Sequence, residues 1–167
     1  VAVVADDAAS AGHVLDDLTA LVDQSLVRRD YSNANLRFSM LETIREFALR
    51  ELTVQSEEAT TRERHAAWYR DLVASFDLHH ARQGDAARSR VLLAEQDNLR
   101  QALAWFAETD DAISLNRLSA ALAKLWFDLG QFSEARHWLQ LAIANDAGVD
   151  VLTRARAWNK AGWLAMC

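Results

Sequence analysis

The chain has no proline, only five glycines, and a single cysteine, Cys167, among its 167 residues. Proline and glycine are the residues that most often interrupt helices, so their scarcity predicts long helices joined by few tight turns. One cysteine excludes a disulfide framework within the chain and a paired-thiol redox centre. This cysteine usage suits a reducing compartment, and we expect the protein to be cytoplasmic.

Positive charge is also scarce. The chain has 18 Lys and Arg against 24 Asp and Glu, a formal net charge of −6. Proteins that hold nucleic acid across a broad surface use clustered basic residues to displace counterions, so this composition disfavours a nucleic-acid clamp. No apolar run is long enough to span a bilayer, and the opening VAVVADDAASAG lacks the basic start of a signal peptide. We therefore expect no membrane partner.

The first part of the chain shows a helix, a hairpin and a second helix. Apolar residues at helical spacing predict a helix over residues 13–26, and a strand over 26–31 follows it. The turn-forming sequence SNAN occupies residues 32–35. In LRFSMLETIREFALREL, residues 36–52, the apolar spacing changes from alternate positions to helical spacing, so a strand leads directly into a helix. Helix, hairpin and helix form the second half of a winged-helix domain.

The remainder of the chain is predicted to be helical throughout. A weak break at residues 83–85 leaves open whether residues 86–93 form a helix or a linker. The helices are expected over residues 57–80, 96–107, 112–129, 132–144 and from 151 onward.

Two of these helices form a hairpin with a regular pattern of large and small residues. Gly130 ends the first helix, at a position where left-handed backbone conformation favours glycine. Small Ala135 and Ala142 allow close helix approach, and Trp126 and Phe132 fill the space between the helices. The pattern resembles a tetratricopeptide repeat helix pair. Its members are Leu122, Trp126, Gly130, Phe132, Ala135, Leu139 and Ala142.

The pattern restarts after Gly148, which favours a repeat array over a generic antiparallel helical bundle. The predicted fold is therefore mainly α, with a partial winged helix and its β-hairpin in residues 1–54. An α-helical tetratricopeptide-like repeat array follows in residues 55–167, truncated at its C-terminus. Because Val1 is not an initiator methionine and Cys167 falls within a predicted helix, we expect the chain to be a piece of a longer protein.

Five segments in fixed order carry a resemblance to a known family. They are LTALVDQSLVRRD, RFSMLETIREFALREL, RERHAAWYRDL, AEQDNLRQALAWF and LWFDLGQFSEARHWLQLAI, which begin at residues 18, 37, 62, 94 and 125. Together they make the chain similar to bacterial STAND-type signal-transduction ATPases of the LuxR-like and SARP-like transcriptional regulator group. In that family an NB-ARC-type nucleotide-binding domain precedes a winged helix and a helical repeat region.

The resemblance implies that ATP or ADP binds a nucleotide-binding domain missing from the N-terminal side, and that this chain itself holds no cofactor. It implies three kinds of partner: the nucleotide-binding domain of the same parent chain, an inducer or partner protein on the helical array, and DNA only through other domains.

The chain departs from the family at one motif. The Met-His-Asp triplet, whose histidine senses nucleotide in relatives, falls on Met40, Leu41 and Glu42. Leucine cannot donate a hydrogen bond, so we expect Leu41 to pack in the core instead. A phosphate-binding loop needs Gly-Lys followed by Ser or Thr, and neither Lys124 nor Lys160 follows a glycine. No ATPase can therefore be active within this chain.

Other functions find little support in the residues. The candidate recognition helix over 13–26 carries Asp16, Asp17 and Asp23 but no Arg or Lys, and carboxylates repel phosphates. The adjacent His79 and His80 point about 100° apart on a helix and cannot easily share a metal ion. We predict no catalytic, cofactor-binding or metal-binding residue. We expect the six tryptophans to act as core anchors, whereas an exposed subset on a concave face would mark a ligand site.

The leading hypothesis is a non-catalytic relay and protein-interaction segment of a larger ATP-dependent transcriptional regulator, which couples the missing nucleotide-binding domain to a sensor repeat region. Arg28, Arg29 and Arg45 are predicted to make interdomain contacts. One alternative is a stand-alone helical-repeat adaptor that binds a peptide or protein partner in its groove. Another is a DNA-binding winged-helix protein.

Overall fold

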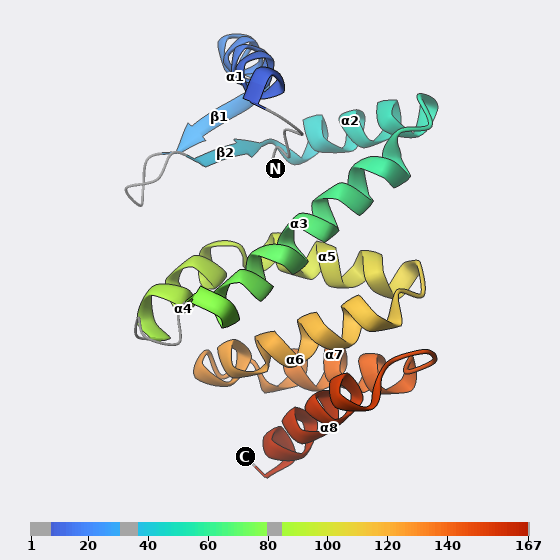
Figure 1. The fold of residues 1–167 in the computed structure, drawn as a ribbon. Helices are drawn as coiled ribbons and strands as arrows, with labels where there is room; N and C mark the ends of the chain where they lie inside the picture. Colours follow the sequence, from blue (N-terminus) through green and yellow to red (C-terminus); the bar gives the residue numbers. More distant parts are fainter. Residues whose placement is uncertain (1–7, 31–36, 80–84, 167) are drawn as a thin grey trace. The chain divides into compact units, whose positions relative to one another are not determined.

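The structure is a computed structural model that describes residues 8–30, 37–79 and 85–166. Contacts divide the chain into unit 1, residues 1–65, and unit 2, residues 66–167. The fold is mainly α, with one two-stranded hairpin (Figure 1). The elements are α1 (Ala8–Asp23), β1 (Val27–Asp30), β2 (Arg37–Met40), α2 (Glu42–Val54), α3 (Glu58–His79), α4 (Asp85–Ala94), α5 (Gln96–Glu108), α6 (Ala112–Asp128), α7 (Phe132–Ala144) and α8 (Val151–Ala165).

Most predicted elements are confirmed with small shifts of their ends. The first helix covers residues 8–23 rather than 13–26. It ends earlier than predicted because Ser25 adopts a left-handed φ of 60°. Residues 86–93 lie within helix α4, which answers the question that their sequence left open. The predicted SNAN loop lies outside the described residues. The unit boundary falls inside α3, and the predicted domain boundary between residues 54 and 55 stays a prediction.

Unit 1 contains an antiparallel hairpin between two helices of the chain. Val27 faces Met40 across the hairpin, and Asp30 faces Arg37. Among the described residues of this unit, Val27 is the one buried hydrophobic side chain. The apolar side of α1 is half-buried, and its members are Val14, Leu18, Leu21 and Val22.

The prediction that Leu41 packs in the core is wrong. Its side chain is 45% exposed. Leu41 is the N-cap of α2 and has extended backbone angles, φ −62° and ψ 144°. It therefore stands just before the first helical residue, Glu42, and outside the helical spacing of α2.

Unit 2 contains a continuous core built by its consecutive helices. α6 packs against α5, α7 and α8, and α7 also packs against α8. Asp111 caps α6 by accepting a hydrogen bond from the backbone N–H of Ser114 at 3.0 Å, and Asp150 caps α8 through the N–H groups of Leu152 and Thr153. Such caps satisfy amides that lack partners in the first helical turn. Both α6 and α8 thus begin at defined residues.

Five of the seven residues predicted to pack the repeat hairpin are buried on α6 and α7. Leu122, Trp126 and Leu139 are at most 2% exposed, and Ala135 and Ala142 are fully buried. Phe132 is half-buried. The prediction that this packing is of the tetratricopeptide type stays a prediction.

The tryptophans do not all serve as core anchors. Trp126 is buried, but Trp68 is 38% exposed and Trp158 is 57% exposed. The prediction is therefore wrong for these two. Residue type alone does not reveal which face of a helix meets a neighbour, because an amphipathic ring packs readily at a half-exposed surface.

Replacing Gly130 with alanine should destabilise unit 2 by about 1 kcal/mol. Gly130 has a φ of +69° between α6 and α7, and the N–H of Gln131 donates to the carbonyl of Trp126 at 2.8 Å. A Cβ at Gly130 would meet no atom within 4 Å, so the cost is conformational rather than steric. Urea unfolding followed by circular dichroism measures it.

Gly162→Ala provides the matched control for this prediction. Gly162 lies inside α8, and a Cβ there also meets nothing within 4 Å. Alanine should raise stability at this position, by about 0.5–1 kcal/mol, because glycine is a poor helix former. Equal effects of the two substitutions would contradict the conformational explanation.

Candidate functional site: the groove between α6 and α8

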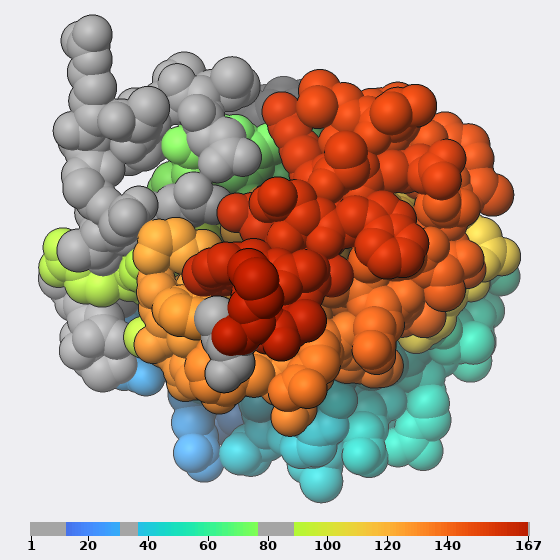
Figure 2. Space-filling model, turned by 90° about the horizontal axis from the view of Figure 1, so that it is seen from below, coloured from blue at the N-terminus to red at the C-terminus, as the bar shows by residue number. Residues whose placement is uncertain are grey.

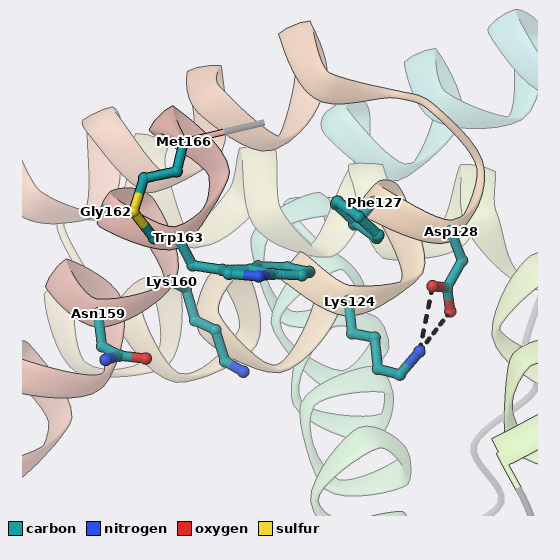
Figure 3. A pocket seen from close by; sticks show the side chains of 8 residues that line it. All are labelled: Lys124, Phe127, Asp128, Asn159, Lys160, Gly162, Trp163 and Met166. Atoms are coloured by element: carbon teal, nitrogen blue, oxygen red, sulfur yellow. Dashed lines mark hydrogen bonds and ion pairs between the residues drawn. The ribbon is translucent and has the colours of Figure 1, made fainter.

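A groove of about 650 Å³ lies in unit 2 between α6 and α8 and is open to solvent. In Figure 2, α8 lies at the surface of this unit beside α6 and α7. The side chains that line the groove are shown in Figure 3. They are Lys124, Phe127 and Asp128 from α6, and Asn159, Lys160, Gly162, Trp163 and Met166 from α8 and its C-terminal end.

Helical spacing places these residues on facing sides of the two helices. On α6 the lining residues are separated by three and four positions, and on α8 Asn159, Trp163 and Met166 follow the same rule. Positions three and four apart lie one above the other on a helix. The groove is therefore a property of two helix faces rather than of a loop.

The base of the groove is aromatic. The ring centroids of Phe127 and Trp163 are 4.4 Å apart, with an angle of 38° between the ring planes. Phe127 also meets Phe132 of α7 edge to face, at 5.8 Å. At one end Met166 is 82% exposed. These side chains offer an apolar surface to which an apolar group could bind.

Both lysines of the chain line this groove. The Nζ atom of Lys124 donates to both carboxylate oxygens of Asp128, at 3.1 and 2.8 Å. The Nζ atom of Lys160 lies 5.8 Å from the centre of the Trp163 ring, within cation–π range. Because Asp128 balances Lys124, the groove has one positive charge in excess.

A polar cluster joins α5 to α7. The guanidinium of Arg100 donates to the two carboxylate oxygens of Glu134, at 2.7 and 2.8 Å, and to Asp97 at 2.7 Å. The hydrogen bond from Arg100 lowers the pKa of the Glu134 carboxyl below its usual range. Gln96 also donates to the side chain of Gln131. These contacts hold α7 in place, and α6 and α8 both pack against α7.

The arginines predicted to make interdomain contacts lie in unit 1. Arg28 and Arg29 are exposed neighbours on β1, so they point to opposite faces of the hairpin. Arg45 of α2 donates to the Glu42 carboxylate, with one distance of 2.9 Å, and this hydrogen bond raises the pKa of its guanidinium. Arg45 therefore has a local partner already. The interdomain role of the three residues stays a prediction.

A smaller hollow lies between α1 and the hairpin of unit 1. Its volume is about 260 Å³. Its lining includes Met40, the first residue of the triplet aligned with Met-His-Asp, and also Asp17. The remaining lining residues are Val14, Leu18, Leu21, Val27, Phe38 and Ser39.

Sequence reasoning did not single out the groove residues as a site. One available signal was the lysine count, because a chain with 16 arginines has just two lysines, and both lie in the region predicted to be helical. A second signal was the helical spacing of Asn159, Trp163 and Met166. That α6 and α8 face each other could be seen only in the folded chain.

The part of the chain that the structure describes contains no group of three His, Cys, Asp or Glu residues placed to hold a metal ion. Within the same described residues, no helix is both long enough and apolar enough to cross a membrane.

These features define a helical module whose candidate site is an open binding groove. Searches for related proteins find three curated relatives, each 34% identical over 152 residues. One is from Mycobacterium bovis and two are from strains of Mycobacterium tuberculosis. All three bear the name HTH-type transcriptional regulator, which their names mark as provisional.

The match covers 86% of this chain but 17% of each relative, so the chain spans about a sixth of the length of these proteins. An alignment of 152 residues is longer than either structural unit and therefore includes parts of both. No family model matches the chain. No solved structure matches it either.

Proposed function

We propose that this chain is the non-catalytic relay and protein-interaction segment of a larger transcriptional regulator. The observation that carries the proposal is the alignment, since it runs through both structural units to proteins about six times longer that are named as regulators. Unit 1 would be the C-terminal part of a winged helix. Unit 2 would receive an inducer or partner protein in the groove between α6 and α8.

The finer proposal places the parent among STAND-type ATPases with an NB-ARC-type nucleotide-binding domain, of the LuxR-like or SARP-like group. The order of helix, hairpin, helix and helical array supports it. The half-buried apolar side of α1 offers surface that further helices of a winged helix would cover. ATP or ADP would then bind outside this chain, and exchange would shift a two-state packing equilibrium that each ligand biases.

Direct DNA binding by this chain is not the function that its surface supports. Asp16, Asp17 and Asp23 are all exposed on α1, the helix that would enter a DNA groove. Carboxylates there oppose phosphate contact. DNA would be bound through other domains of the parent.

Charge reversal at Arg28 and Arg29 tests the relay. In the full-length regulator, the double variant Arg28→Glu, Arg29→Glu should reduce signal-dependent transcription from its target promoter by about tenfold, the effect of a coupling free energy near 1.4 kcal/mol. A reporter assay measures the response with and without the signal. Arg136→Glu, on the exposed side of α7, is the control for added negative charge.

An unchanged response, at unchanged protein level, would remove Arg28 and Arg29 from the mechanism. Two cheaper observations test the parent. A Gly-Lys-Ser/Thr phosphate-binding loop encoded upstream of Val1 supports the ATPase proposal. A start codon directly before Val1 would instead favour a stand-alone helical-repeat adaptor, which the open groove equally permits.

A further inference from the structure

We propose that the groove between α6 and α8 binds an extended peptide segment in which a carboxylate side chain lies beside an apolar one. Lys160 would hold the carboxylate, and the Phe127–Trp163 surface would hold the apolar side chain. This inference deepens the proposed function, because it specifies the chemistry of the partner on the helical unit.

Charge is the first argument. The chain has a net charge of −6, yet both of its lysines line this groove. Lys124 is paired with Asp128, at 2.8 Å for the shorter contact, and that pair contributes no net charge. Lys160 is half-buried and lies over the face of Trp163 rather than beside a carboxylate of the groove. A group placed next to Lys160 would therefore meet a positive charge, and an anionic group complements it.

The apolar base is the second argument. Phe127 and Trp163 lie with ring centroids 4.4 Å apart and are each half-exposed, and Met166 extends the surface at 82% exposure. Figure 3 shows the Trp163 ring between Lys160 and Phe127, so the charged and apolar parts of the groove adjoin. A ligand with neighbouring acidic and apolar groups would complement both the charged and the apolar part of the groove.

Gly162 is the third argument, and it points to a polypeptide backbone. Glycine inside a helix costs about 0.5–1 kcal/mol relative to alanine. At Gly162 the backbone does not require it, and a Cβ would meet nothing within 4 Å, so packing in this chain does not require it either. A missing side chain in a groove wall permits close approach of a ligand's main chain. The exposed amide of Asn159, three residues earlier on the same wall, has the donor and acceptor that a peptide unit needs.

The openness of the groove favours a peptide over a small molecule. Small-molecule sites enclose most of their ligand, whereas this groove is open to solvent between two helices. Its α8 wall runs from Asn159 to Met166, about 10 Å of helix at 1.5 Å per residue. Three or four residues of an extended peptide cover that length.

The test uses the complete 167-residue chain and a phage-displayed library of random 12-residue peptides. Enriched peptides are synthesised with a fluorescein label, and their dissociation constants are measured by fluorescence polarisation at low salt. We expect enrichment of Asp or Glu two positions away from Leu, Ile or an aromatic residue, because alternate side chains of an extended peptide lie on the same face. Replacing that acidic residue by its amide should weaken binding about fivefold to tenfold.

Three variants separate the contributions. Lys160→Gln should weaken binding by a similar factor, and Arg136→Gln, which removes the same charge outside the groove, should change it less than twofold. Gly162→Ala should weaken binding while raising stability, a combination that damage to the fold cannot produce.

Enrichment of basic or purely apolar peptides, no enrichment at all, or equal binding to Lys160→Gln would overturn the proposal. These outcomes are distinct from failure of the proposed function. That function is judged by the reporter response of the full-length regulator, and a partner of different chemistry in the groove would leave it intact.

Discussion

Replacing Asn116 with aspartate should destabilise unit 2 by about 3–5 kcal/mol at pH 7, a substantial part of the stability of a small domain. Asn116 is fully buried in α6. Its Nδ2 group donates to the carbonyls of Ala112, Ala142 and Asn145, at 2.9, 2.7 and 3.2 Å. Aspartate has nearly the same shape, but its ionised carboxylate would face these three oxygen atoms without a donor.

The loss should depend on pH in a defined direction. Burial against carbonyl oxygens raises the pKa of the new carboxyl above its value in the unfolded chain. The destabilisation is then complete above the folded-state pKa, and it shrinks as the pH falls toward the unfolded value, because the protonated carboxyl is neutral and can donate one hydrogen bond. Urea unfolding followed by circular dichroism at several pH values measures both the size and the trend.

Asn159→Asp is the matched control for Asn116→Asp. It makes the same chemical change at an exposed position on α8 and should alter stability by less than about 0.5 kcal/mol. If Asn116→Asp were as stable as the unchanged chain at pH 7, the amide of Asn116 could not be the donor that joins α6 to the end of α7.

Replacing Trp126 with alanine should cost about 3–5 kcal/mol, whereas Trp158→Ala should cost less than about 0.5 kcal/mol. The substitution is chemically the same at both positions. Trp126 is 2% exposed between α6 and α7, and Trp158 is 57% exposed on α8. Removing the first ring leaves a cavity in a close-packed core, and removing the second leaves water where water already has access.

Thermal and urea unfolding of the two variants provides the measurement. Similar losses at both positions would mean that Trp158 is covered in solution, and the exposed face of α8 would then need a partner. A small loss at Trp126 would contradict the core described for α6 and α7. Residual tryptophan fluorescence, with five indoles left in each variant, supplies a second signal of unfolding.

Sequence periodicity determined which segments become helices in this protein. The helices over residues 96–108, 112–128 and 132–144 follow the predicted ranges closely, because their apolar residues recur at helical spacing and no proline interrupts them. Gly130 could be placed at a helix end for a local reason, since its left-handed φ is a preference of the residue itself. The strand that leads directly into α2 was likewise visible in the change of apolar spacing.

The tertiary structure alone decided which side chains the core covers and which remain available for binding. Leu41 belongs to the apolar pattern of the sequence but is exposed. Trp158 is also exposed, although it is the same residue type as the buried Trp126. Asn116 is polar and fully buried, because the carbonyls at the end of α7 come to its amide only when α6 and α7 pack. Lys124 and Lys160 are far apart in the chain and meet at one groove because α6 and α8 face each other. Local spacing sets the helices, but burial and shared sites depend on contacts between residues that are distant in sequence.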